Sequence, residues 1–582
     1  MKAESRNEHK RKFDWWLLIN LVVLISMSMP VSAEIITSGR RVTWQGNVGV
    51  PGGIPNRTTI CATLSSGATA SQINSALSSC PSGQVVKLNS GTYSISNTIS
   101  IPSNVTLRGN GPLSTVLQNS GATPILRIGS GSHGSTVSIT SGYTKGSSAI
   151  TLSSASGKDV GDVLLIDQQN DGSLVNNSGA NGTCNWCGND SGTRSLNFTA
   201  IITGKNGNTI TIDPPFPYTF SSGLNPEAEE ITGGVSYAGV EDLKIINSPS
   251  DSNPSIYMDG ARYSWLKNVE SERPYKDSGG GRHGVMRYGF RNEIRDSYFH
   301  ENNAYSTNSY GWELVWGSSY TLVENNIMKG AKVYMYFAYG GTGTVIGYNY
   351  VYDIANAWPT YTGDFQGHGA HSMMALFEGN FAQKLKFDWI WGSASHHTFF
   401  RNWYRLTQPA GSQSLTNDPY IVEIWYDNPY FNLVGNVLGD PSKNWSYEAP
   451  GCSGNTIYVI GYNAEGCSSS RDSQVRATLL RHGNFDYATG TAKWCDDSGE
   501  PGCQGGDASH TIPNSLYLSS RPSWWCNETP WPPIGPDLSP MASDIPAKRR
   551  YEGLACTTSS GTPPPPPPLD LQPSPPTIIN VE

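Results

Sequence analysis

The sequence has few charged residues. Lys, Arg, Asp and Glu make up 15% of its 582 residues, and the formal net charge is −8. No block of basic residues stands out within the body of the chain, whereas nucleic-acid binding needs such a block to neutralise phosphates. We therefore expect no nucleic acid among its partners. Nothing in the sequence indicates an oligomeric state.

Long hydrophobic runs are missing beyond the first residues. One apolar run, Trp15 to Met27, follows a basic segment (His9 to Lys12) and precedes the small residues Val31-Ser32-Ala33. This order is typical of a secretory signal, whereas a membrane span needs about 20 apolar residues. We interpret residues 1–33 as a signal peptide and expect a secreted, extracellular protein without a membrane contact after export. An uncleaved anchor is the alternative.

The chain has ten cysteines, an even number, so all of them can form disulfides and none has to stay unpaired. An even number suits an oxidising compartment. The Cys184-x-x-Cys187 pair lacks a second such pair or a nearby His, so we expect a loop disulfide rather than a zinc site. The cysteines fall in five local pairs: Cys61/Cys80, Cys184/Cys187, Cys452/Cys467, Cys495/Cys503 and Cys526/Cys556.

A short phrase recurs through the middle of the chain without helical periodicity. It consists of apolar residues followed by a small turn-forming residue, and it recurs every 22 to 34 residues. Asn suits such a turn, and stacked Asn side chains form a ladder. This pattern predicts an all-β, right-handed parallel β-helix, a solenoid with a long groove for a polymer. The turn positions are Asp242, Asn268, Ser297, Asn326, Asn349, Asn380, Asn402, Asn436 and Asn463.

The first coils carry a recognisable pattern. A short helical segment, Ala70 to Leu77, precedes GQVVKLNSGTYSISNTISIPSNVTLRGNG at residues 83–111. The segment resembles the first coils of the pectate-lyase-like superfamily of secreted β-helix proteins, and with the later turns the resemblance covers most of residues 60–480. It implies the fold strongly and the substrate weakly, because that superfamily contains lyases, hydrolases, epimerases and viral depolymerases.

The solenoid is expected to be one part of a longer arrangement. We predict an N-terminal cap helix with the first coils at 34–131, a small inserted β unit at 132–235, and the main coils at 236–484. A Trp- and Pro-rich segment at 485–560 is expected to form a C-terminal cap, and a proline-rich tail follows at 561–582.

Four short segments align on their strands and predict an acidic column. Glu313, Tyr336, Asp388 and Glu423 take equivalent places, and carboxylates should point away from an apolar core. Leu314, Phe337, Trp389 and Ile424 would then stack inside. Asp388 and Glu423 belong to consecutive coils, which places their carboxyl groups roughly 5–9 Å apart, a separation that suits glycoside hydrolysis.

Histidines and aromatic residues crowd the same region. His368, His371, His396 and His397 lie near Asp364, Asp388 and Arg401 in the sequence, and such a group supplies a general base. We expect His396 or His397 to tune one carboxylate, Asp364 to be a reserve carboxylate, and Arg401, His368 and His371 to bind substrate. Aromatic faces stack on sugar rings, so four aromatic residues are expected to bind substrate too: Tyr336, Trp358, Tyr361 and Trp425. Glu313, from the predicted column, completes the expected binding set.

The catalytic motifs of known members of the superfamily are not found. Gly367-His368-Gly369 matches a tripeptide of polygalacturonases, but their N-T-D and R-I-K motifs are missing. The W-x-D-H and R-x-P-x-x-R patterns of pectate lyases are missing too, and no acidic cluster resembles their calcium site. The resemblance therefore transfers no catalytic residue to this chain.

Three hypotheses follow for function. The first is a polysaccharide hydrolase with Asp388 and Glu423 as acid and base and with no required cofactor or metal. The second is a polysaccharide lyase acting on a uronate polymer, with Ca²⁺ or the cations Arg287, Arg291 and Lys384 stabilising the intermediate. The third is a glycan-binding surface protein without catalysis. A polysaccharide is the expected partner in all three.

Overall fold

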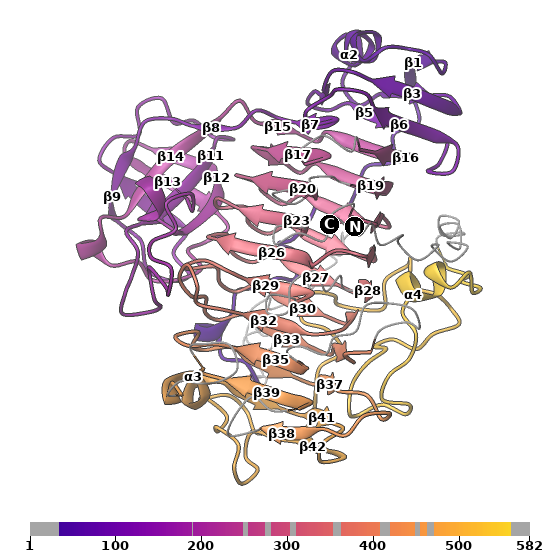
Figure 1. Ribbon diagram of the computed structural model, residues 1–582. Coiled ribbons are helices and arrows are strands. Elements are labelled where there is room, and N and C mark those ends of the chain that lie inside the picture. The colour runs from indigo at the N-terminus through magenta and orange to yellow at the C-terminus, as the bar shows by residue number, and fades with distance from the viewer. Residues whose placement is uncertain are drawn as a thin grey trace, which may run out of the picture.

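The structure is a computed structural model that describes residues 34–188, 190–247, 254–273, 281–302, 310–352, 363–407, 419–448, 454–462 and 471–559. Most of these residues form a solenoid of short parallel strands (Figure 1). Its coils are built from two large sheets that face each other across an apolar core. The α-helices among the described residues are short: α2 (Ala70–Ser79), α3 (Ser473–Thr478) and α4 (Pro546–Tyr551).

The first large sheet has 11 strands, which stack one above the next along the solenoid in Figure 1. Apart from its last strand, each strand comes from a later coil than its neighbour, and the pairings are parallel. Its members, in order along the solenoid, are β4 (Ile99–Ile101), β7 (Leu126–Ile128), β17 (Ile256–Asp259), β20 (Arg282–Arg287), β23 (Tyr310–Val315), β26 (Val333–Tyr339), β29 (Phe365–Gly367), β32 (Leu385–Phe387), β35 (Tyr420–Ile424), β39 (Thr456–Ile460) and β38 (Ser446–Glu448).

The second large sheet has 22 strands and bends at a turn within each coil. Before the turn stand β2 (Val85–Leu88), β5 (Thr106–Arg108), β21 (Glu293–Arg295), β24 (Leu322–Glu324), β27 (Val345–Gly347), β30 (Leu376–Glu378), β33 (Thr398–Phe400), β36 (Asn432–Val434) and β40 (Leu480–His482). After it stand β3 (Gly91–Ile95), β6 (Thr115–Asn119), β22 (Tyr298–His300), β25 (Ile327–Lys329), β28 (Tyr350–Tyr352), β31 (Phe381–Ala382), β34 (Trp403–Tyr404), β37 (Val437–Leu438) and β41 (Asn484–Asp486). The long strands β16 (Gly239–Ile246) and β19 (Trp265–Glu272) run through the turn, and β1 (Ile60–Leu64) and β42 (Thr491–Lys493) lie at the ends.

An asparagine ladder occupies these turns. The side-chain amide of each Asn donates to the side-chain oxygen of the next, at 2.8 to 3.0 Å. Each Asn oxygen also accepts the backbone N–H of the preceding ladder residue, so the polar turn is satisfied inside the protein. The members are Asn326, Asn349, Asn380, Asn402, Asn436 and Asn484. Asn484 thus follows Asn436, whereas Asn463, the expected last member, lies outside the described residues.

Helix α2 covers the first coil. Thr69 begins it with a capping box, and Ile73 and Leu77 are buried against the core. Asn74 accepts the N–H of Ser100 and donates to the carbonyl of Thr98, which satisfies backbone groups at the terminal strand β4. The open edge of the 11-stranded sheet is protected in this way.

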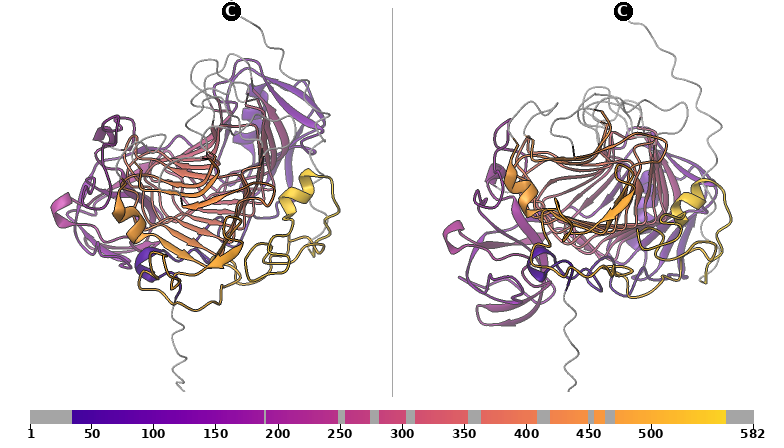
Figure 2. Two further views of the ribbon diagram at one scale, coloured as in Figure 1. Left: turned by 60° about the horizontal axis from the view of Figure 1, so that its bottom comes forward. Right: turned by 90° about the horizontal axis from the view of Figure 1, so that it is seen from below.

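A separate antiparallel sheet lies beside the 11-stranded sheet, on the opposite side of the solenoid from α4 (Figures 1 and 2). We call it the inserted unit. Its strands are β8 (Ser132–His133), β9 (Val137–Ser141), β10 (Ala149–Leu152), β11 (Val163–Gln168), β12 (Leu196–Asn206), β13 (Thr209–Asp213) and β14 (Glu227–Thr232). Its loop at 171–188 reaches the coil of β32, where Asn181 donates its N–H to the carbonyl of Ile390, just beyond the end of that strand.

Residues 34–58 form an extended strap along the solenoid, which the sequence pattern did not predict. The strap runs from late coils to early ones and bonds to each group of coils in turn. Its contacts include Arg40 to Asn432 at 2.7 Å, Trp44 to Met374 at 3.1 Å, Gly49 to Tyr320 at 3.0 Å and Arg57 to Thr106 at 3.0 Å. We refer to residues 34–58 as the N-terminal strap.

The prediction of an all-β parallel β-helix is confirmed by these strand pairings. Four of the expected cysteine pairs are disulfides, whereas Cys452 and Cys467 lie outside the described residues. The expected signal segment and the proline-rich tail lie outside them as well. Within the described ranges, no helix is long and apolar enough to cross a membrane.

Candidate functional site

The outward face of the 11-stranded sheet carries a column of polar side chains. Backbone register places Glu313, Tyr336, Gln366, Lys386 and Glu423 opposite one another in successive coils. The adjacent residues point inward: Leu314, Phe337, Phe387 and Ile424 are in the core. Stacked parallel strands therefore bring residues up to 110 positions apart into one row, about 4.8 Å from neighbour to neighbour.

The expected alignment was wrong in one coil. Asp388 does not stand in the column, because Lys386 pairs with Glu423 and Asp388 follows two residues later, just beyond the end of β32. Trp389 likewise does not stack inside; it is half-buried and its ring contacts Tyr426, while Phe387 takes the interior place. The coil of β29 also intervenes between Tyr336 and this coil.

Asp388 and His368 form a dyad beside the column. Nδ1 of His368 lies 2.7 Å from Oδ2 of Asp388, and each residue follows its strand by one position in neighbouring coils. Asp388 also accepts the side-chain amide of Gln366 at 3.0 Å and the N–H of Ile390 at 3.0 Å. Burial opposes ionisation of Asp388, but the charge and hydrogen bond of His368 outweigh it and lower the pKa of Asp388. Asp388 is therefore an ionised carboxylate that orients the imidazole.

Glu423 lies in a buried ionic cluster in the next coil. Lys384 is ion-paired with one carboxylate oxygen, and Lys386 lies 3.5 Å from the other. The indole of Trp425 donates to the same carboxylate at 3.2 Å, and the ammonium of Lys386 lies 4.6 Å from the Trp425 ring. Glu423 and both lysine side chains are at most 1% exposed, whereas His368 retains 16%. His368 is therefore the member of this group that solvent reaches.

The N-terminal part of the outward face is rich in arginine. Glu313 is ion-paired with Arg282 at 2.8 Å, and burial raises the pKa of Glu313 despite that opposite charge. Arg287 bonds to Asp259 at 2.7 Å. The face therefore pairs carboxylates with guanidinium groups, whereas the expected column contained three carboxylates, one tyrosine and no cation.

Three of the expected histidines lie elsewhere, which corrects their predicted roles. His397 is inside the core against Phe387 and Phe431, and burial lowers its pKa to about 3. His396 stacks on Tyr430, away from Asp388, and burial again lowers its pKa to about 3. His371 accepts the N–H of Asp171 from the inserted unit, and burial lowers its pKa to about 4. All three are buried neutral residues that hold turns in place.

Two further candidates are also structural. Arg401 is 1% exposed and donates to Asp537 and to the carbonyls of Ile512, Pro513 and Ile534, so it anchors the C-terminal segment and not a substrate. Asp364 accepts the N–H groups of Gln383 and Lys384 at a corner of the coil. Burial raises the pKa of Asp364 to about 8, against those hydrogen bonds.

Of the other residues predicted to bind substrate, only some lie within the described residues. Trp425 lies in the Glu423 cluster. Trp358 and Tyr361 lie outside the described residues, as does the side chain of Tyr336. Sequence reasoning missed Lys386 and Gln366, although the inward-outward alternation of Leu385-Lys386-Phe387 is the signal that reveals them.

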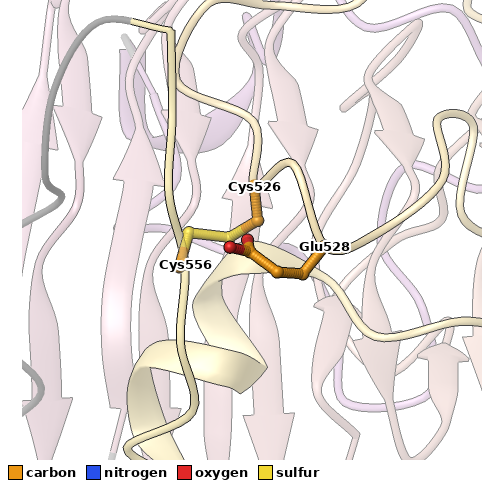
Figure 3. Close-up of side chains that lie close together, drawn as sticks. All are labelled: Cys526, Glu528 and Cys556. Carbon is orange, nitrogen blue, oxygen red and sulfur yellow. A yellow bond between two sulfur atoms is a disulfide. The ribbon is translucent and has the colours of Figure 1, made fainter.

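Possible metal ligands gather in three places among the described residues, and each is already occupied by other bonds. Figure 3 shows Cys526, Glu528 and Cys556, but the two sulfurs form a disulfide and offer no thiolate. Lys244 neutralises Glu270 and Glu272 beside His300, and Arg194 neutralises Asp167 and Glu227. None of these groups belongs to the His368–Asp388 dyad.

Comparison with known proteins adds solved structures of low similarity. No protein-family model and no curated protein sequence matches the chain. The tailspike protein gp49 from Pseudomonas phage LKA1 is 13% identical over 71% of this chain and 67% of its own, with a TM-score of 0.47. An alginate lyase from Paenibacillus sp. str. FPU-7 is 12% identical over 68% and 95%, with a TM-score of 0.32. The polygalacturonase from Erwinia carotovora ssp. carotovora is 10% identical over 75% and 93%, with a TM-score of 0.26.

These likenesses carry no argument about activity, because all three TM-scores are below 0.5. The strand pairings define the class: a parallel β-helix whose 11-stranded sheet bears a row of ionisable side chains on its outward face.

Proposed function

We propose that the protein is a carbohydrate-active enzyme that cleaves an acidic polysaccharide by β-elimination on the outward face of the 11-stranded sheet. The observation that carries this proposal is the His368–Asp388 dyad, 2.7 Å long, whose imidazole is the accessible member of an otherwise buried ionic group. A carboxylate on Nδ1 leaves the lone pair on Nε2, so the ring is oriented as a general base.

The reaction needs a base and a positive environment. In a uronate residue the base removes the proton on the carbon next to the carboxyl group, and the bond from the neighbouring carbon to the glycosidic oxygen then breaks. A carbon–carbon double bond forms, the base keeps the proton that it removed, and the departing oxygen takes up a proton from water. His368 supplies the base in this scheme. Lys384 and Lys386 share the single carboxylate of Glu423, so this buried group carries an excess positive charge, which would favour the electron-rich intermediate.

Hydrolysis is the second candidate, because Asp388 and Glu423 lie in consecutive coils on one face. Two residues along the strand and one strand across correspond to about 8 Å, a separation in the range of inverting glycosidases. The lowered pKa of Asp388 favours elimination, since this ionised carboxylate is not set up as a proton donor, and Glu423 is enclosed by two lysines and closed off from solvent. The roles of Asp388 and Glu423 as acid and base in hydrolysis are tested by the same experiment as elimination, which is described below.

The setting proposed for this reaction is extracellular. The four described disulfides fit an oxidising compartment. The substrate would then be a polysaccharide that the protein meets after export.

The experiment incubates the full chain with polygalacturonate, polymannuronate and neutral amylose. Reducing ends and ultraviolet absorbance are followed together, with Ca²⁺ or with a chelator. Both signals rising on a polyuronate support elimination, and reducing ends alone support hydrolysis. A Ca²⁺ requirement would show that a lyase needs more than Lys384 and Lys386. Glycan binding without either signal would identify a non-catalytic binding protein and overturn the proposal.

Variants assign the residues. His368→Ala should lower kcat at least 100-fold, because general-base catalysis contributes about 10² to 10⁴. Asp388→Asn should also lower kcat, by loss of the orienting carboxylate. The matched control is His510→Ala, since His510 is an exposed histidine paired with Asp496 in the C-terminal segment. Elimination that survives His368→Ala would contradict the assigned base.

A further inference from the structure

The disulfide loop of the inserted unit presents a tryptophan beside the proposed site. Cys184 and Cys187 are bonded to each other and are at most 2% exposed. They pack with Val285, Val315 and Val333, three residues of the 11-stranded sheet. Trp186, between the two cysteines, is 50% exposed. Within the described residues it is the only aromatic among the large apolar side chains that are exposed.

Two other indoles join Trp186. The Trp391 ring lies edge-on to Trp186 at 4.5 Å between centroids, and the indole N–H of Trp316 donates to the carbonyl of Trp186 at 3.3 Å. Trp316 follows β23 and Trp391 follows β32 by a few residues, so the loop joins coils that are well separated along the solenoid. We call Trp186, Trp316 and Trp391 the tryptophan platform.

Cationic side chains continue from this platform. The guanidinium of Arg287 lies 4.8 Å from the Trp316 ring and 5.0 Å from the Tyr257 ring. The guanidinium of Arg127 also contacts Tyr257, at 4.8 Å from the same ring. Indole faces suit the apolar C–H face of a sugar ring, and guanidinium groups suit its carboxylate.

The platform is tied mechanically to the dyad. The carbonyl of Ile390 accepts the N–H of Asn181 from the inserted loop, while the N–H of Ile390 donates to Asp388. A Cβ on Gly179 would lie 2.1 Å from the carbonyl oxygen of Trp389, so the loop backbone lies directly against this turn. The backbone of one residue, Ile390, thus connects the loop that carries Trp186 with the carboxylate that orients His368.

We infer that the tryptophan platform, with Arg287, is a binding subsite for the part of an acidic polysaccharide that extends beyond the His368–Asp388 dyad. The substrate class rests on the proposed function; the subsite itself rests on the exposed indole, its two indole neighbours and the adjoining arginines. The Cys184–Cys187 disulfide acts as a rigid support, because a short covalent loop holds Trp186 outward without its own secondary structure.

The test measures binding and turnover separately. The His368→Ala chain is titrated with polygalacturonate and polymannuronate by calorimetry and by quenching of tryptophan fluorescence. Adding Trp186→Ala should weaken binding about tenfold and remove part of the quenching, and Trp186→Phe should retain most of the affinity. Leu554→Ala is the control, since Leu554 is 44% exposed in the C-terminal segment. Turnover is measured in the chain that retains His368. There, Trp186→Ala should raise KM for the polymer and change kcat on short oligosaccharides little.

The outcomes separate the two proposals. Unchanged polyuronate affinity in a folded Trp186→Ala variant overturns the subsite, whatever the activity. Trp186-dependent binding without any turnover keeps the subsite and overturns the enzyme. Amylose that binds as tightly as the polyuronates, with the same Trp186 dependence, overturns the acidic substrate class. Trp186→Ala decides between these outcomes, because it removes an exposed side chain without breaking the Cys184–Cys187 disulfide.

Discussion

Replacing Asn380 by Leu in the asparagine ladder should remove a large part of the stability of the solenoid. The Asn380 amide donates to the carbonyl of Ile346 at 2.8 Å and to Asn402 at 2.9 Å. Its oxygen accepts the backbone N–H of Asn349 at 2.9 Å and the Asn349 amide at 3.0 Å. All of these groups are buried, and Leu has a similar size but no polar atom.

The magnitude follows from the groups left without partners. The backbone N–H of Asn349 and the carbonyl of Ile346 lose the bonds to Asn380, and a buried unsatisfied group costs about 1–3 kcal/mol. With the Asn349 amide also losing one acceptor, we expect a loss of about 4 kcal/mol in the free energy of unfolding. That is a large fraction of the roughly 5–15 kcal/mol typical of folded proteins.

The assay is urea unfolding followed by the fluorescence of the buried tryptophans, among them Trp265 and Trp312. Asn97→Leu is the control, because Asn97 is exposed in a bend between strands and its side-chain amide donates to the hydroxyl of Ser96 at 3.4 Å, an exposed bond. That variant should stay within about 0.5 kcal/mol of the original chain. A loss below about 1 kcal/mol for Asn380→Leu would refute the view that the ladder carries stability.

Two further predictions concern stability. Arg40→Met should cost about 2 kcal/mol in urea unfolding, because the buried guanidinium donates to Asn432, Phe431 and Thr478, whereas Arg41→Met, which loses an exposed ion pair to Glu34, should cost less than about 1 kcal/mol; equal losses would contradict the role of the N-terminal strap. Stability should also fall on both sides of an intermediate pH. Since burial lowers the pKa of His397 to about 3 from its usual 6.5, the unfolded chain binds the extra proton first, and stability is lost as pH falls below about 6.5 towards 3. Since burial raises the pKa of Asp364 to about 8 from its usual 3.8, the folded chain keeps its proton longer, and stability is lost as pH rises from about 4 to 8. Unfolding measured across pH 4–8 should show a shallower acid slope for His397→Gln and a shallower alkaline slope for Asp364→Asn, and unchanged slopes would contradict these assignments.

The Asn turns were readable in the sequence because each coil needs one buried polar corner. Asn326, Asn349, Asn380, Asn402 and Asn436 all take the places expected of them in the ladder. Asn484 was not expected there, since α3 and residues outside the described ranges separate it from Asn436 by 48 positions. Periodicity finds a coil only when its length resembles that of the others.

The site was harder to predict, because its strands are only three residues long. Asp388 was placed two residues out of register, and the error exchanged Lys386 for Asp388 in the outward column. His368 was recognised as a candidate, but its carboxylate partner depends on the stacking of β29 on β32. His397 directly precedes β33 and is a core residue, because it packs against Phe rings that come from several coils.

By itself, the amino-acid sequence determined the class of fold, since alternating apolar residues and recurrent Asn turns have one stable arrangement, stacked parallel coils. It also indicated disulfides from the even number of cysteines, but which cysteines pair was decided by the structure. Only the tertiary structure decided the path of the N-terminal strap, the His368–Asp388 dyad and the place of Trp186 against Trp391. These contacts join residues from about 20 to 390 positions apart, and their geometry depends on register and on loop packing, which no local pattern specifies.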